Sequence, residues 1–96
     1  MRFEWEEAKQ RKNIAKHGID FHGCDRVFDG FTATFEDCRF DYGEPRFKTL
    51  GLWHDCVVSI IHTETAEAIR LISIRKATLY EQKIYFSTLH NELGQN

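Results

Sequence analysis

Several polar side chains with the chemistry of bases and phosphate binders lie on or beside three strand-like segments. His62 and Glu64 end one segment, Arg70 and Arg75 belong to the next, and Arg46 begins a third. Cleavage of RNA without a metal ion needs a base for the 2′-hydroxyl proton, a cation for the charge that develops on phosphorus, and an acid for the departing 5′-oxygen. His62 or Glu64 fits the first role, and the arginines fit the second.

The same side chains also have ordinary structural interpretations. Arg70 and Glu64 can form a cross-strand ion pair worth under about 1 kcal/mol. His62 can be a histidine at the end of a strand, and Arg75 can protect a sheet edge from aggregation. Residue chemistry alone therefore leaves both an active site and an unremarkable sheet surface open.

Charge is distributed unevenly along the chain. Four bases and no acids lie between Lys9 and Lys16, and His17 follows them. The acid that protonates the departing 5′-oxygen could be Lys9, His17 or His62. Residues 70–83 hold four bases against one acid, and residues 29–44 hold five acids against one base. This pattern predicts one surface for an anion and another for a basic partner, although an ordinary mixed surface has the same composition.

Composition limits the class of protein. The 96 residues have a net charge of −2 and an apolar fraction of 42%, which fits a single folded domain over residues 1–96 and excludes a disordered tail. An overall acidic chain binds a nucleic acid only through a local basic patch. No apolar run is long enough to cross a bilayer, and the acidic start of the sequence is unlike a signal peptide, so we expect a cytoplasmic protein without a membrane partner.

Motifs for metals and cofactors are lacking in the sequence. There is no glycine-rich phosphate loop and no H-E-x-x-H or G-x-S-x-G motif. His17, His22 and Cys24 are conceivable metal ligands, but their spacing fits no standard zinc pattern and a fourth ligand is missing. We therefore expect no metal site and no cofactor, and a metal-dependent hydrolase is a poor third hypothesis.

The first half of the chain must supply helices to position these residues. Alternation predicts a strand over 2–5, and good helix formers predict a helix over 6–17 that ends at Gly18. Asp20 is expected to cap a second helix over 21–28. Alternating apolar residues predict a strand over 31–36, followed by an acidic loop over 37–45.

The second half reads as strands joined by short turns. Strands are expected over 46–53, with a bulge at Gly51, and over 56–62 and 68–75. A capping box predicts a helix over 79–90. The order β-α-α-β-β-β-β-α indicates an α+β fold with an antiparallel meander, two N-terminal helices and one C-terminal helix. On the last strand, Ser73 and Arg75 should share one face, and Arg70, Ile72 and Ile74 the other.

These segments, taken together, resemble one known family. Phe3-Glu4-Trp5, Lys9, Asn13 and Lys16-His17-Gly18-Ile19 resemble the opening of the BrnT toxins, and Gly43-Glu44-Pro45-Arg46-Phe47 resembles their central segment. The run Ile69-Arg70-Leu71-Ile72-Ser73-Ile74-Arg75-Lys76-Ala77-Thr78, with Glu81 and Tyr85, resembles their C-terminal signature. The resemblance extends over about residues 3–86 and implies a RelE-like fold.

The resemblance also implies a function and partners. BrnT toxins belong to type II toxin–antitoxin systems and are ribonucleases that block translation. The implied partner is a BrnA-like ribbon-helix-helix antitoxin in a heterotetramer, which contacts DNA only through the antitoxin. The residues carried over are, for catalysis, His62, Arg75, Arg46 and Glu64, and, for RNA binding, Arg70, Lys76, Lys9 and His17. A non-catalytic partner-binding module with the same fold is the alternative.

Overall fold

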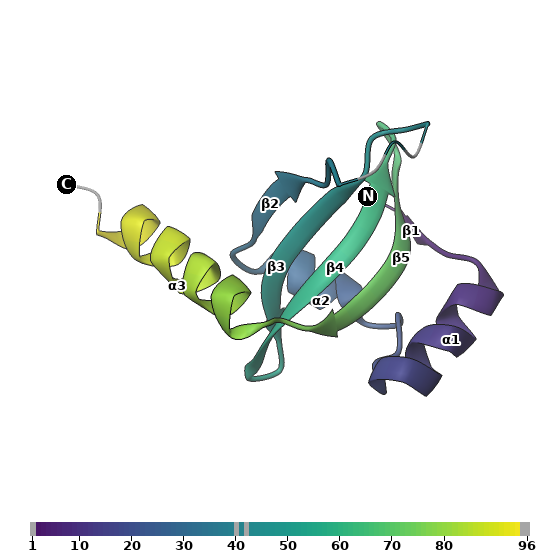
Figure 1. Cartoon of the computed structure of the whole chain (residues 1–96), viewed down its shortest axis with the longest axis horizontal. Helices are drawn as coiled ribbons and strands as arrows, with labels where there is room; N and C mark the ends of the chain where they lie inside the picture. The colour runs from purple at the N-terminus through teal and green to yellow at the C-terminus, as the bar shows by residue number, and fades with distance from the viewer. Residues whose placement is uncertain (1, 40, 42, 95–96) are drawn as a thin grey trace.

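A computed structural model describes residues 2–39, 41 and 43–94 of the chain (Figure 1). The elements follow in the order β1 (Arg2–Glu4), α1 (Glu7–His17), α2 (Cys24–Asp29), β2 (Ala33–Glu36), β3 (Phe47–Trp53), β4 (Cys56–Glu64), β5 (Ala68–Lys76) and α3 (Leu79–Leu93). The expected α+β class is confirmed. Among the described residues, no helix combines the length and apolar character needed to span a membrane.

The five strands form one sheet in the order β1-β5-β4-β3-β2. Neighbours from β2 to β5 are antiparallel, but β1 runs parallel to β5, so the sheet is mixed and the expectation of a purely antiparallel sheet is wrong. In this position Phe3 is partly buried against the main core. Its ring packs 5.4 Å from that of Phe28 while the β1 backbone pairs with the free edge of β5.

The register between β4 and β5 shifts at one point. Ile61 pairs with Ser73, whereas the next residue, His62, pairs with Leu71. Ile72 is therefore an extra residue in β5, and it reverses the alternation of side chains along this strand. Arg70, Ser73 and Arg75 consequently share a face, which corrects the expectation that Arg70 lies opposite the other two.

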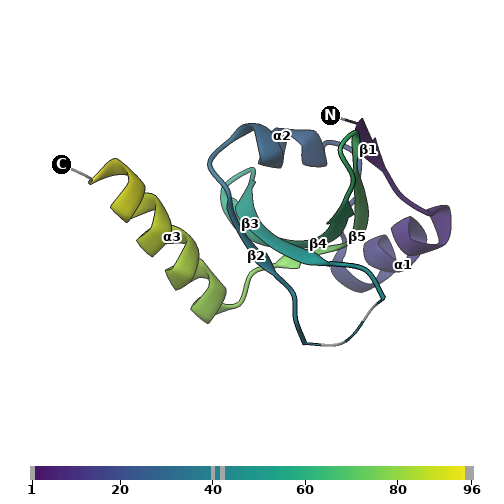
Figure 2. The same ribbon diagram turned by 90° about the horizontal axis from the view of Figure 1, so that it is seen from above.

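The sheet is strongly curved, and α2 lies inside the curve (Figure 2). The main core fills this concave side with fully buried side chains such as Phe21, Val27 and Ile60. Gly51 stays in regular register, opposite Val58, so the bulge expected there is wrong. A Cβ on Gly51 would meet Val27 Cγ1 at 2.5 Å. Glycine is thus required by the close approach of α2 rather than by the strand backbone.

The start of α2 also differs from expectation. Its N-cap residue is Gly23, with φ 87° and no side-chain cap. Asp20 instead accepts hydrogen bonds from the backbone N–H of His22 and from the side chain of Gln10. The Asp20 carboxylate therefore stabilises the turn before α2 and does not cap the helix.

Helix α1 covers the part of the β5 edge that β1 leaves open. The Asn13 side chain donates to the Ile74 carbonyl at 2.9 Å and accepts from the Ile74 N–H at 3.0 Å, as a neighbouring strand would. It also donates to the Ile19 carbonyl at 2.9 Å. Gly18 ends the helix in the left-handed conformation with φ 70°, as the sequence predicts.

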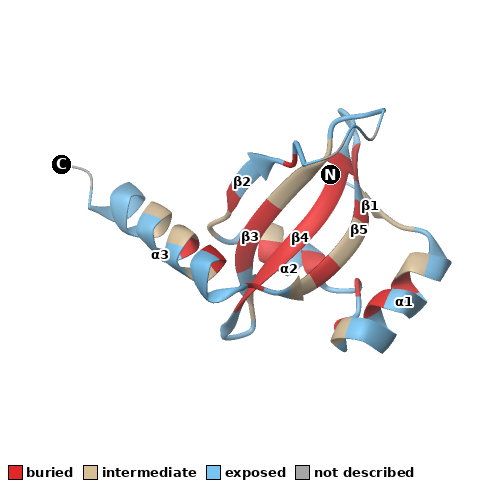
Figure 3. Ribbon diagram, in the orientation of Figure 1, coloured by how far each residue is buried: buried red, intermediate tan, exposed pale blue. Residues whose placement is uncertain are grey.

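Helix α3 begins at the expected capping box, in which Thr78 accepts from the Glu81 N–H and Glu81 accepts from the Thr78 N–H. Tyr85, only 1% exposed, packs in a second core with Leu50 and Val57. The rest of the helix projects away from the sheet (Figures 1 and 2) and is exposed along most of its length (Figure 3). The convex face of the sheet is left between α1 and α3.

Candidate functional site

A hollow on the convex face lies between α1 and the strands β4 and β5, and we call it the basic hollow. The charged side chains among its described lining residues are Lys9, Lys12, Lys16, Arg39 and Arg75, together with His17. No Asp or Glu is among the described residues that line it. A protein with a net charge of −2 therefore presents a concentrated positive surface here.

Helix geometry explains how α1 contributes to this surface. Lys9, Lys12 and Lys16 recur at intervals of three and four residues, which places them on one side of a helix. Asn13 lies within the same stripe, and its two hydrogen bonds to Ile74 fix that side of α1 against β5. The lysines consequently line the same hollow as Ser73 and Arg75, although Lys12 and Lys16 remain exposed to solvent.

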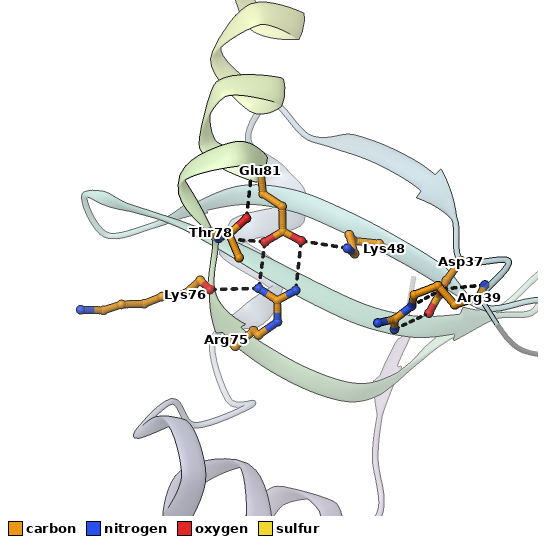
Figure 4. A network of polar contacts seen from close by, with 7 residues as sticks. All are labelled: Asp37, Arg39, Lys48, Arg75, Lys76, Thr78 and Glu81. Atoms are coloured by element: carbon orange, nitrogen blue, oxygen red, sulfur yellow. Dashed lines mark hydrogen bonds and ion pairs between the residues drawn. The ribbon is translucent and has the colours of Figure 1, made fainter.

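Arg75 is fixed by Glu81 from α3, as Figure 4 shows. Its two terminal nitrogens donate to the two carboxylate oxygens at 2.8 and 3.0 Å, and one of them also donates to the Lys76 carbonyl at 3.2 Å. Lys48 from β3 donates to Oε2 of the same carboxylate at 2.8 Å. Glu81 thereby holds two cations from separate strands next to each other.

The charge state of Glu81 follows from these contacts. Burial by itself would raise the pKa of this carboxyl group, whose side chain is 8% exposed. Hydrogen bonds from Arg75, Lys48 and the Thr78 N–H outweigh burial and lower the pKa to about 2. Glu81 is therefore ionised at neutral pH, so it positions cations and cannot donate a proton.

A third cation held by a carboxylate comes from the loop after β2. Asp37 is buried and accepts from Arg39 Nε at 2.8 Å and from Arg39 Nη2 at 2.9 Å. The Arg39 side chain itself remains 60% exposed. A bidentate pair of this kind fixes the orientation of a guanidinium.

His17 is the titratable group of the basic hollow that is suited to neutral pH. Partial burial lowers the pKa of its imidazole, and the positive charges of Lys16 and Arg75 lower it further. The ring is therefore neutral at pH 7 and able to accept a proton. Its placement at the end of α1 brings an imidazole and the Arg75 guanidinium to one hollow.

His62 lies on the other face of the sheet. Its side chain is fully buried, stacks on Phe47 and makes an edge contact with Phe28. Nε2 is 2.7 Å from Thr49 Oγ1, and Nδ1 is 3.7 Å from the Glu64 carboxylate. Burial lowers its pKa despite the opposing effect of Glu64. In this structure the imidazole of His62 has no exposed surface that an RNA phosphate could contact.

The other residues considered from sequence are dispersed. Arg46 lies at a separate hollow formed by the loop before β3, and Arg70 lies 3.9 Å from Glu4 at the far end of β5. Glu64 is exposed at the end of β4. The Lys76 side chain points away from the Arg75–Glu81 pair in Figure 4. The basic hollow thus brings together Arg75, Lys9 and His17 from the sequence-based set, and leaves the remaining members elsewhere.

Three charged residues of this surface were not among the candidates from sequence. Lys48 could have been suspected as a lone cation inside an otherwise apolar strand. Glu81 was identified from sequence as part of a capping box and of the C-terminal signature, but not as a site residue. Arg39 had no local signal, because its role depends on the buried Asp37 and on the path of the loop.

No three His, Cys, Asp or Glu side chains are grouped as metal ligands within residues 2–39, 41 and 43–94. The cations of the basic hollow are the groups that can bind an anion here. A curved mixed sheet with such a hollow has the local positive charge that an overall acidic protein needs to bind a polyanion.

Comparison with known families identifies the class more closely. The family model described as the ribonuclease toxin, BrnT, of type II toxin–antitoxin systems matches residues 5–81. The chain belongs to this family, whose description supports a ribonuclease activity and implies an antitoxin partner. No curated protein matches the sequence.

Proposed function

We propose that this toxin is a metal-independent endoribonuclease that inhibits translation by cutting RNA at the basic hollow. The observation that carries the proposal is the convergence of Arg75, the α1 lysines and His17 on one surface. Guanidinium and ammonium groups can supply the electrostatic stabilisation for which many nucleases use a metal ion. The family match supports RNA as the polyanion.

The proposed reaction is attack of a 2′-hydroxyl on the adjacent phosphorus. Neutral His17 removes the 2′-hydroxyl proton, and Arg75 stabilises the charge on the phosphorane. Lys9, less exposed than Lys12 and Lys16, protonates the departing 5′-oxygen. A P–O bond forms at the 2′-oxygen and the bond to the 5′-oxygen breaks, leaving a 2′,3′-cyclic phosphate and a 5′-hydroxyl. Glu81 acts indirectly, by positioning Arg75.

The finer expectations about fold and partners are part of the same proposal. We propose a RelE-like fold, a cytoplasmic location, and a BrnA-like ribbon-helix-helix antitoxin that forms a heterotetramer and contacts DNA. Exposed apolar residues on α3, such as Leu79, Phe86 and Leu93, offer surface for a protein partner. The type II toxin–antitoxin family supports the existence of such a partner.

A non-catalytic partner-binding module is the second candidate. One observation favours it: Arg75 and Lys48 are already paired with Glu81, which reduces the positive charge left for a phosphate. In that case the exposed cations of α1 would bind an acidic partner surface.

Incubation of purified protein with a structured RNA in excess chelator separates these functions. The ribonuclease proposal predicts discrete products that end in a cyclic phosphate, and loss of cleavage in His17→Ala. Intact RNA would favour the partner-binding module, and cleavage that chelator abolishes would favour a metal-dependent hydrolase. Growth arrest on expression, relieved by the antitoxin, tests the toxin activity independently.

A further inference from the structure

A second hollow on the convex face lies between β2, β3 and the start of α3, and we call it the aromatic hollow. We propose that it binds one unpaired nucleobase of the RNA whose phosphate occupies the basic hollow. This inference rests on the proposed ribonuclease function and adds to it a site that selects single-stranded RNA.

The lining of the aromatic hollow suits a flat ring. Its apolar walls include Phe35, Leu50, Tyr80 and Ile84. The Phe35 side chain is 44% exposed and Tyr80 is 74% exposed, so both rings offer a face to a ligand. An exposed aromatic ring beside a cationic surface is the usual platform for a splayed-out base.

The two hollows are neighbours on the sheet. The register places Phe35 opposite Lys48, Lys48 opposite Ile61, and Ile61 opposite Ser73. The first two of these residues line the aromatic hollow, and the last two line the basic hollow. With about 4.8 Å between strands, this row extends roughly 14 Å from β2 to β5. Arg39 lines both hollows and joins them at the loop.

Charged groups at the junction can hold the backbone of a strand that crosses it. Lys48 and Glu81 line the aromatic hollow and Arg75 lines the basic hollow, so the ion pair of Glu81 with Arg75 (Figure 4) connects the two linings. A phosphate bound at Arg75 therefore has the aromatic hollow on one side and the lysines of α1 on the other. The exposed Thr78 adds a hydroxyl group that can contact a base edge.

A nucleobase explains this hollow better than an apolar side chain of a protein partner does. The apolar residues that α3 exposes farther along, Phe86 and Leu93, are not among the described residues lining it. The hollow instead adjoins the basic hollow, with which it shares Arg39, and this favours a ligand that carries negative charge next to a flat ring.

The test uses the full chain and short oligoribonucleotides centred on a mapped cleavage site. One 2′-deoxy nucleotide at that site removes the attacking hydroxyl, so that binding is measured without cleavage. A second series carries an abasic nucleotide at each position next to the cut in turn. The variants are Phe35→Ala and Tyr80→Ala, and Phe86→Ala is the matched control on α3. Thermal unfolding verifies that each variant is folded.

Wild type should lose affinity on the order of tenfold when the base at one flanking position is removed. Phe35→Ala or Tyr80→Ala should weaken binding of the complete oligonucleotide by a similar factor, and should then be insensitive to the abasic change. Phe86→Ala should behave as wild type. This non-additivity is specific for contact between the ring and the base.

Two results would overturn the base site while leaving the ribonuclease proposal intact. One is RNA cleavage with unchanged affinity in both variants, and the other is equal sensitivity to the abasic change with and without the rings. Weaker antitoxin binding in those variants, with RNA binding unaffected, would assign the aromatic hollow to the protein partner. Absence of both RNA binding and cleavage by wild type would refute the proposed function itself.

Discussion

Replacement of Glu81 by Gln removes the negative charge that holds Arg75 and Lys48 together, and its cost can be worked out from the structure. The pKa of Glu81 is lowered from 4.5 to about 2. Each pH unit corresponds to about 1.36 kcal/mol, so the ionised carboxylate contributes about 3 kcal/mol to the free energy of unfolding at pH 7. Glutamine can retain the capping box. We therefore expect Glu81→Gln to cost about 2–3 kcal/mol at pH 7.

The lowered pKa of Glu81 also makes the stability of the protein depend on pH. Below its ordinary pKa, the carboxyl group is protonated in the unfolded chain while it stays ionised in the folded protein, so the contribution is lost as pH falls from about 4.5 towards 2. Roughly 2 kcal/mol of it should disappear between pH 7 and pH 3. The difference between wild type and Glu81→Gln should shrink accordingly.

Urea denaturation at pH 7, 5, 4 and 3, followed by circular dichroism, measures this difference. Glu92→Gln is the matched control, because Glu92 is exposed on the same helix, and it should change stability by under about 0.5 kcal/mol. An equal cost of Glu81→Gln at pH 7 and pH 3, or no cost at pH 7, would refute the role assigned to the carboxylate.

Three further substitutions test the fold that positions the site. The unfolded chain binds a proton at His62 at higher pH than the folded protein does, because burial lowers its folded pKa. The free energy of unfolding of wild type should therefore fall as the pH is lowered below about 6.5. Denaturant titrations should show a smaller fall for His62→Gln below the same pH. Gly51→Ala should lower the free energy of unfolding by about 1–3 kcal/mol, because the new Cβ would contact Val27. Gly30→Ala is the control for thermal unfolding and should be tolerated, because the nearest atom to its new Cβ, the Val27 carbonyl oxygen, is 3.8 Å away. Asn13→Ala should lower the free energy of unfolding by about 2–3 kcal/mol, because it leaves buried backbone groups unpaired. Lys12→Ala removes an exposed side chain and should not lower stability. Equal melting temperatures of the two variants would contradict this role of Asn13.

Local sequence patterns were sufficient to locate the helices and strands. The capping box at Thr78 and the glycine after α1 act within a few residues, so the local sequence predicts the start of α3 and the end of α1. The alternation of β2 and the apolar runs of β4 and β5 indicated strands for the same reason. The parallel pairing of β1 was not predictable, because it depends on long-range contacts: the ring contact of Phe3 with Phe28 and the pairing of β1 with β5.

The site was harder to predict because its residues come together through long-range contacts. Lys48 and Glu81 are 33 positions apart, and one extra residue in β5 decides which face Arg70 occupies. His62 was a candidate because of its imidazole and the family resemblance, and the nearly continuous apolar run of β4 did not reveal which face of the sheet it takes. The α1 lysines and Arg75, by contrast, stood out in the charge pattern and do line the basic hollow.

Cleavage rates of Arg75→Ala and Arg70→Ala on one RNA test the central claim most directly. Both arginines belong to β5 and share a face, but Arg75 lines the basic hollow whereas Arg70 lies beside Glu4. Arg75→Ala should lower the single-turnover rate on the order of a hundredfold or more, while the folded fraction is verified by circular dichroism. Arg70→Ala should remain within about threefold of wild type, since it loses only an exposed ion pair. Equal rates for the two variants, or a larger loss in Arg70→Ala, would contradict the assignment of the basic hollow as the active site.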